Sequence, residues 1–86
     1  MEYKFHYDAG HGWLEVKRKE IEELNLQDKI SEYSYMAGDK VYLEEDCDFG
    51  VFADAKGWTP SIWKTLIEEV DDGDESMIRS FEQWRK

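Results

Sequence analysis

The side chains of this chain that can do chemistry are many carboxylates, two histidines and one cysteine. The carboxylates gather in two runs, one directly after residue 43 and one between residues 68 and 75. A row of carboxylates imitates the phosphates of nucleic acid, because duplex DNA carries roughly one negative charge per 1.7 Å of its axis. We therefore expect a partner-binding surface made of Glu44, Glu45, Asp46, Asp48, Glu68, Glu69, Asp71, Asp72, Asp74 and Glu75. The alternative is that these acids are ordinary solvated charges.

His6, His11 and Cys47 are residue types that bind metals, and two hairpins could bring them together. Their spacing matches no recognised metal site, and the acids beside Cys47 are expected to raise the pKa of its thiol. The acidic stretch 71–75 lacks the alternating ligands of a calcium-binding loop. We expect no metal and no other cofactor, with a small metal-binding protein or enzyme at His6, His11 and Cys47 as the less favoured alternative.

Catalytic machinery is hard to find in this sequence. A serine or cysteine nucleophile needs a neighbouring base, and the chain offers His6 and His11 alone for that role. Gly10 and Gly12 open a hairpin instead of a helix, so they do not form a phosphate-binding loop. We expect a binding protein and no catalytic residues.

Alternating apolar and polar residues predict the strands that would position these groups. Residues 3–7 and 13–16 predict a first hairpin around a glycine-containing turn. Residues 33–35 and 40–43 predict a second hairpin in the same way.

Helical segments are expected between and after these hairpins. Residues 17–24 are strong helix formers, and Asn25 suits a left-handed end. A second helix is predicted over residues 49–56, with Asp48 as its N-cap and Gly57 as its C-terminal stop.

The segment after Pro60 permits two interpretations. Trp63, Leu66, Ile67 and Val70 have helical spacing, which favours a helix, whereas residues 65–70 would also suit an edge strand. A last apolar stripe follows at Ile78, Phe81 and Trp84. The expected fold is α+β, a small antiparallel sheet of three to four strands with two to three short helices, in one domain spanning residues 1–86.

Composition limits the kinds of partner. Hydrophobic residues make up 41% and aromatic residues 15% of the 86 residues, which predicts a packed core. The net charge is -10, and residues 44–86 hold 12 of the 21 acids against 5 of the 11 bases. Direct nucleic-acid binding is disfavoured, because Lys17, Arg18 and Lys19 are the one basic cluster. We expect a basic protein partner, no membrane association and a cytoplasmic location, since no apolar run of about 18 residues and no secretory signal stand out.

Three stretches resemble a group of short proteins that bacteriophages and other mobile elements carry: HGWLEV at 11–16, ISEYSYMAGDKVYLEEDCD at 30–48 and IRSFEQW at 78–84. The resemblance covers most of the chain and brings no catalytic residues with it. It implies a setting, because small acidic phage proteins often inhibit host defence, as anti-CRISPR and anti-restriction proteins do. Some of these inhibitors imitate the charge pattern of DNA.

Two kinds of binding protein therefore remain open. The first is a phage-type inhibitor that occupies the positively charged surface of a host defence or nucleic-acid-handling protein, as a DNA mimic would. The second is a protein-interaction module that binds through an aromatic patch, with its charge serving solubility alone. Steep salt dependence of binding would favour the first, and weak salt dependence the second.

Overall fold

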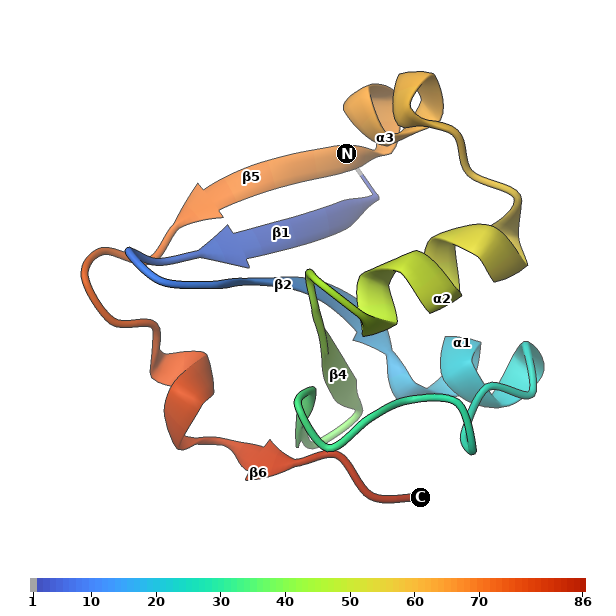
Figure 1. The fold of residues 1–86 in the computed structure, drawn as a ribbon, viewed down its shortest axis with the longest axis horizontal. Coiled ribbons are helices and arrows are strands. Elements are labelled where there is room, and N and C mark those ends of the chain that lie inside the picture. Colours follow the sequence, from blue (N-terminus) through green and yellow to red (C-terminus); the bar gives the residue numbers. More distant parts are fainter. Residues whose placement is uncertain (1) are drawn as a thin grey trace.

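The computed structural model describes residues 2–86, which form three short α-helices and one mixed sheet of six strands (Figure 1). The elements in chain order are β1 (Tyr3–Tyr7), β2 (Gly12–Lys17), α1 (Arg18–Glu23), β3 (Tyr35–Ala37), β4 (Lys40–Glu44), α2 (Asp48–Lys56), α3 (Pro60–Leu66), β5 (Ile67–Asp71), a 3₁₀ helix η1 (Met77–Ser80) and β6 (Glu82–Gln83). The strands are ordered β5-β1-β2-β4-β3-β6 across the sheet. The α+β class and the short helices are confirmed, whereas the sheet is larger than the three to four strands expected and is not purely antiparallel.

Both predicted hairpins are present. β1 and β2 pair antiparallel with Phe5 opposite Leu14, and β3 and β4 pair antiparallel with Met36 opposite Val41. The third strand begins at Tyr35, two residues later than predicted, because the chain turns at Ser34 and buries this side chain.

Two predicted helix ends also appear where the sequence placed them. Asn25 follows α1 with a φ of 57°, and Gly57 ends α2 with a φ of 71°. Both values lie in the left-handed region, which asparagine and glycine tolerate better than most residues.

The segment after Pro60 is a helix followed by a strand. α3 ends at Leu66 because Ile67 is already extended, and residues 67–71 form β5. β5 pairs parallel to β1, with Tyr3 opposite Ile67 and Phe5 opposite Glu69. The helical interpretation of Ile67 to Val70 is therefore wrong. The pattern of this segment allowed both a helix and a strand, and pairing with β1 favours the strand.

The last segment crosses the sheet from one edge to the other. It leaves β5, passes through η1 and ends in β6, which pairs with β3 at the far edge. Phe81 packs against Tyr42 of β4 at 5.2 Å between ring centroids, with the ring planes tilted by 47°, and Ile78 is buried. This crossover covers part of the sheet face that α1 and α2 leave open.

The core lies between the sheet and the helices α1 and α2. Leu14 and Val41 of the sheet are fully buried against Ile21 of α1 and Phe52 of α2. Trp84, from the last segment, closes the core beside Arg18. In residues 2–86, every helix is too short or too polar to cross a bilayer.

Candidate functional site: an acidic end of the sheet

The strand directions bring the two acidic runs to the same end of the sheet. β1 and β5 run parallel, and β2 runs antiparallel to both β1 and β4, so β1, β4 and β5 all point the same way. In one row of paired residues across the sheet, Glu44 lies opposite Trp13, Trp13 lies opposite His6, and His6 lies opposite Val70. We call the group at this end of the sheet the acidic end; its members are Glu44, Glu45, Asp46, Asp71, Asp72, Asp74 and Glu75.

The acidic end is open to solvent and, within residues 2–86, forms no ion pair with a lysine or an arginine. Five of its members are exposed, and Glu44 and Asp72 are half-buried. Asp72 Oδ2 accepts a hydrogen bond from Ser76 Oγ at 2.6 Å and lies 3.5 Å from His6 Nδ1. Over the described range 2–86, no lysine or arginine lies within 4 Å of any of these carboxylates. Asp72 faces His6, and the charge of Glu75 acts on Arg79. The remaining negative charge is left for solvent ions or a partner to neutralise.

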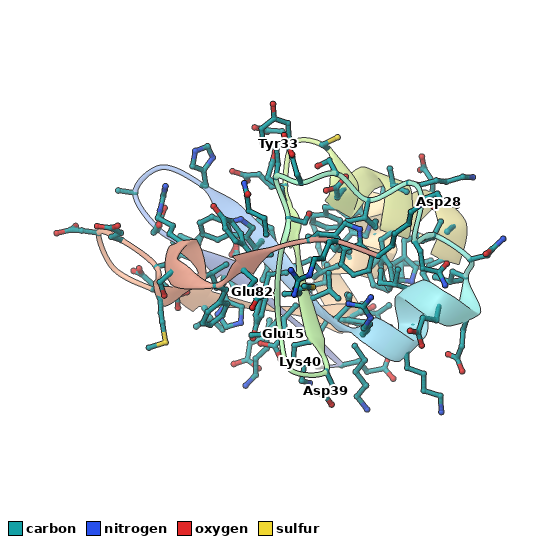
Figure 2. The ribbon with its side chains drawn as sticks, turned by 90° about the horizontal axis from the view of Figure 1, so that it is seen from below. Glu15, Asp28, Tyr33, Asp39, Lys40 and Glu82 are labelled. Atoms are coloured by element: carbon teal, nitrogen blue, oxygen red, sulfur yellow. The ribbon has the colours of Figure 1, made fainter. Side chains whose placement is uncertain are left out.

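Basic side chains lie toward the other end of the sheet. Lys17, at the end of β2, pairs opposite Lys40, at the start of β4. Lys40 Nζ lies 3.6 Å from Glu15 Oε2, and Figure 2 shows these two side chains together with Asp39 on one side of the molecule. Lys56 Nζ lies 4.0 Å from Glu20 Oε2 in the same way. The acids at this second end are thus partly neutralised, and charge is separated along the strands.

The width of the acidic end compares with a short stretch of nucleic acid. Glu44 and the end of β5 are three strand spacings apart, which corresponds to roughly 14 Å. Duplex DNA of that length carries about eight negative charges. Glu44 and Asp71 bound this width, and the other carboxylates of the acidic end lie in the turn after β4 and in the crossover after β5, so the acidic end is as wide as a stretch of several phosphates.

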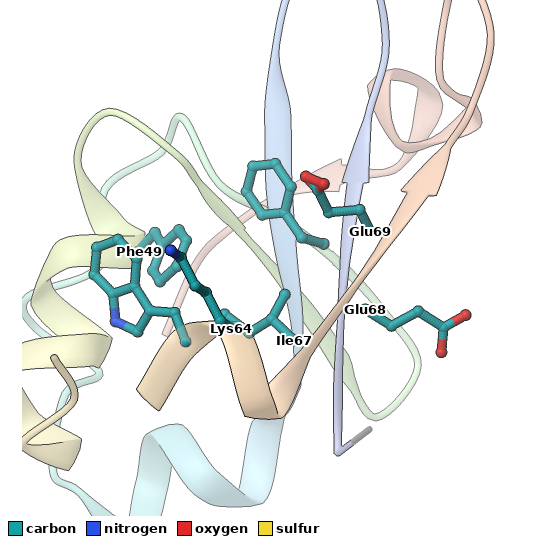
Figure 3. Close-up of a pocket in the computed structure, with 7 residues that line it drawn as sticks. Phe49, Lys64, Ile67, Glu68 and Glu69 are labelled. Atoms are coloured by element: carbon teal, nitrogen blue, oxygen red, sulfur yellow. The ribbon is translucent and has the colours of Figure 1, made fainter. Parts of the chain in front are cut away.

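Glu68 and Glu69 continue the acidic surface along β5. Both are exposed, and as neighbours in a strand they point to opposite faces of the sheet. Figure 3 shows the Glu69 side chain turned toward a pocket between β5 and the helices, and Glu68 turned away from it. The acidic surface thus includes the outermost strand as well as the strand ends.

Asp48 does not belong to this surface, and the prediction that it binds a partner or caps α2 is wrong. Its side chain is fully buried at the first residue of α2, where Cys47 takes the N-cap position. Asp48 Oδ2 accepts hydrogen bonds from Ser31 N at 3.0 Å, Ser31 Oγ at 2.7 Å and Ser34 Oγ at 2.5 Å. These three bonds fasten the loop before β3 to α2, and the buried Ser34 hydroxyl gains a partner by them.

Asp8 holds the acidic end in place, and the sequence analysis did not single it out. Its carboxylate accepts hydrogen bonds from Gly10 N and His11 N, both at 2.9 Å, which close the first hairpin. It also accepts from Ser76 N at 2.8 Å and from Arg79, so it ties the crossover to the turn. The Arg79 guanidinium holds the pKa of this carboxyl well below its usual range. An aspartate before a glycine-rich turn indicates the two turn bonds, but the sequence gives no hint of Arg79.

His6, His11 and Cys47 do not come together as a ligand set. His6 Nε2 lies 2.8 Å from Glu15 Oε1, so both ring nitrogens of His6 face carboxylates. His11 is exposed in the hairpin turn, and Cys47 is exposed in the turn before α2. Within residues 2–86, no group of three or more His, Cys, Asp or Glu residues has the geometry to hold a metal ion.

The exposed apolar side chains are dispersed. Tyr33 is 67% exposed and points away from the body of the molecule (Figure 2), and Met77 is 74% exposed on η1. Tyr7 and Ile62 lie on further elements. Isolated apolar side chains of this kind are normal on a protein surface. The aromatic alternative therefore depends on the pocket beside β5, where Phe49 and Trp63 meet.

Comparison with known protein families, curated proteins and solved structures yields no match to the chain. The interpretation of the site therefore depends on the geometry and charge of its own residues.

Proposed function

We propose that this protein binds a positively charged protein surface through its acidic end, as a mimic of nucleic acid. One observation supports the proposal above others: the fold gathers seven carboxylates at one end of the sheet and gives none of them a lysine or arginine partner within residues 2–86. Charges that serve solubility alone are usually interspersed with charges of the opposite sign, whereas here the acids are separated from the basic residues along the strands.

The physics of such a surface favours a nucleic-acid-binding partner. A protein groove that holds DNA or RNA concentrates lysine and arginine to neutralise phosphates. An acidic end of this width would attract that groove from a distance, speed association and compete with the nucleic acid. The resemblance to small acidic phage proteins adds a setting, in which the partner is a host defence protein or effector complex and the result of binding is inhibition.

Charge reversal at the acidic end tests the proposal. The test variant carries Glu45→Lys, Asp74→Lys and Glu75→Lys, all at exposed positions. The control carries Glu2→Lys, Glu23→Lys and Asp54→Lys, which are exposed acids away from the acidic end. Both variants have the same net charge, so a difference between them reports position and not total charge.

Each protein is used to capture partners from a bacterial lysate at several salt concentrations, and the captured partner is then purified for affinity measurements. We expect the test variant to lose at least about tenfold in affinity, which corresponds to roughly 1.4 kcal/mol, and the control to retain it. We also expect wild-type binding to weaken steeply with salt and to be displaced by DNA. Equal losses in both variants, or binding that ignores salt, would contradict the proposal and favour an apolar interface.

A further inference from the structure

β5 is an edge strand whose outer side is free. It pairs with β1 and, within the described part of the chain, with no other strand, and Figure 1 shows it as the outermost ribbon of the sheet. Asp72 N donates to Tyr7 O at 2.8 Å. Because backbone groups alternate in direction along a strand, those of Val70 and Glu68 also point toward β1. The backbone groups of Glu69 and Asp71 therefore point outward, whereas the Ile67 N–H already donates to Trp63 O at the end of α3. Such an edge is a template for one more strand.

The charges on β5 decide what kind of strand fits. Glu68, Glu69 and Asp71 are all exposed along this edge. Pairing of two copies of β5 would place these carboxylates opposite one another, and like charges on facing strands destabilise the pair. A segment with lysine or arginine at the facing positions would gain from the same charges. The edge is therefore protected against a second copy of this chain and complementary to a basic segment.

A pocket beside β5 supplies a place for an apolar side chain. It has a volume of about 600 Å³ and lies between the sheet and the helices α2 and α3 (Figure 3). The aromatic part of its wall comes from Phe5, Phe49 and Trp63, with Phe49 centred 5.1 Å from Trp63 and 5.8 Å from Phe5. Ile67 of β5 lies in the same wall, so the pocket adjoins the free edge.

Charged groups stand at the rim of this apolar pocket. Glu69 turns toward it from β5, and Lys64 reaches across it from α3 (Figure 3). A side chain from an added strand that points to the helix face would pass Glu69 before entering the pocket. A segment that places an apolar side chain in the pocket and a lysine or arginine beside Glu69 would fit both the aromatic wall and the charged rim.

We propose that the free edge of β5 and the adjoining pocket bind an extended basic segment of the protein partner, which adds to the sheet as a seventh strand. Backbone hydrogen bonds to Glu69 and Asp71 hold the segment, and an apolar side chain anchors it in the pocket. The inference rests on the proposed function for the basic character of the partner, and on β5 itself for the mode of binding.

A peptide selection tests this mode without knowledge of the partner. A random-peptide display library is selected against the immobilised full chain, and the enriched peptides are synthesised. We expect sequences in which lysine or arginine alternates with apolar residues. On binding, amide hydrogen exchange at Glu69 and Asp71 should slow by at least about tenfold, because outward N–H groups that were open to solvent become hydrogen-bonded. Purely electrostatic attachment would leave those exchange rates unchanged.

Two variants separate this inference from the proposed function. Glu69→Lys at the edge should weaken the selected peptides by about tenfold or more, whereas Glu75→Lys at the acidic end should leave their affinity nearly unchanged. The inference is overturned if no peptide is enriched over an unrelated acidic control protein, or if the bound peptides leave β5 exchange rates as they were. Loss of partner binding in the acidic-end variant, with peptide binding intact, would support the proposed function independently of this result.

Discussion

Asp8 and Arg79 lie 71 residues apart in the chain and form a two-point ion pair, in which Arg79 Nε donates to Asp8 Oδ2 at 2.7 Å and Nη2 donates to Oδ1 at 2.9 Å. The pair joins the first hairpin turn to the crossover that follows β5. Arg79 also lies over the buried ring of Trp13, at 5.4 Å from its centroid. Since Asp74 and Glu75 belong to the same crossover, the pair fixes part of the acidic end against the sheet.

The pair predicts a loss of stability in acid. Because Arg79 holds the pKa of Asp8 below its usual range, Asp8 stabilises the fold fully above the unfolded pKa of about 3.9 and loses this contribution as the pH falls toward the folded-state value. Asp8→Asn removes the contribution at every pH. Urea unfolding of both proteins should therefore show a difference in unfolding free energy that is large at neutral pH and shrinks below about pH 4. A difference that stays constant with pH would contradict this assignment.

Gly12 of β2 leaves room for the Phe5 ring of β1, and this close contact leads to a second stability prediction. A Cβ at this position would lie 2.4 Å from Phe5 Cζ and 2.6 Å from Phe5 Cε2. Gly12→Ala should therefore destabilise the protein by about 1 kcal/mol, at the low end of the cost of overpacking, because the half-buried Phe5 ring must shift toward the pocket that it lines. Gly50→Ala is the control: this glycine lies in α2 with open space around its Cβ position, and alanine should stabilise the helix by about 0.5–1 kcal/mol. Equal shifts in the unfolding midpoints of both variants would contradict the contact.

The parts of the fold that sequence reasoning anticipated are those with local causes. Alternation at residues 3–7 specifies a half-buried strand, and Asn25 and Gly57 end helices because of their own backbone preferences. β5 and β6 depend instead on strands far away in the chain. The pair Glu82 and Gln83 has no strand pattern of its own and is defined by pairing with β3.

The candidate site shows the same division. Sequence reasoning found the two acidic runs, whereas their meeting at one end follows from the parallel pairing of β5 with β1, which no local pattern reveals. Asp46 and Asp48 look alike in the sequence, yet one is exposed and the other is fully buried. What separates them is the position of Ser31 and Ser34, which only the folded chain brings to Asp48.

This contrast gives a prediction for stability. Asp48→Ala removes the acceptor of three hydrogen bonds and leaves the Ser34 hydroxyl buried with one bond fewer, so it should cost about 2–3 kcal/mol. Asp46→Ala removes an exposed side chain and should change the unfolding free energy by less than about 0.5 kcal/mol. Chemical unfolding of the two variants measures both values. Similar costs at the two positions would show that Asp48 is not the link between the loop and α2.

Cys47 provides the last prediction, since it is exposed but surrounded by negative charge. The charge of Asp48 is the largest cause that raises the pKa of its thiol, followed by partial desolvation, with smaller contributions from Glu44 and Asp46. The thiolate is the reactive form, so alkylation at neutral pH should be slower than for a free cysteine and should accelerate as the pH rises past the ordinary value of about 8.5.

A variant carrying Glu44→Gln and Asp46→Asn removes charges that disfavour the thiolate, which lowers the pKa of Cys47 and should raise its alkylation rate near pH 7.5 by roughly two- to fivefold. The control Glu23→Gln, on α1, should leave the rate unchanged. Added salt should reduce the difference between wild type and the double variant, because these charges act partly through solvent. A rate that neither the double variant nor salt alters would show that the acids around Cys47 do not set its reactivity.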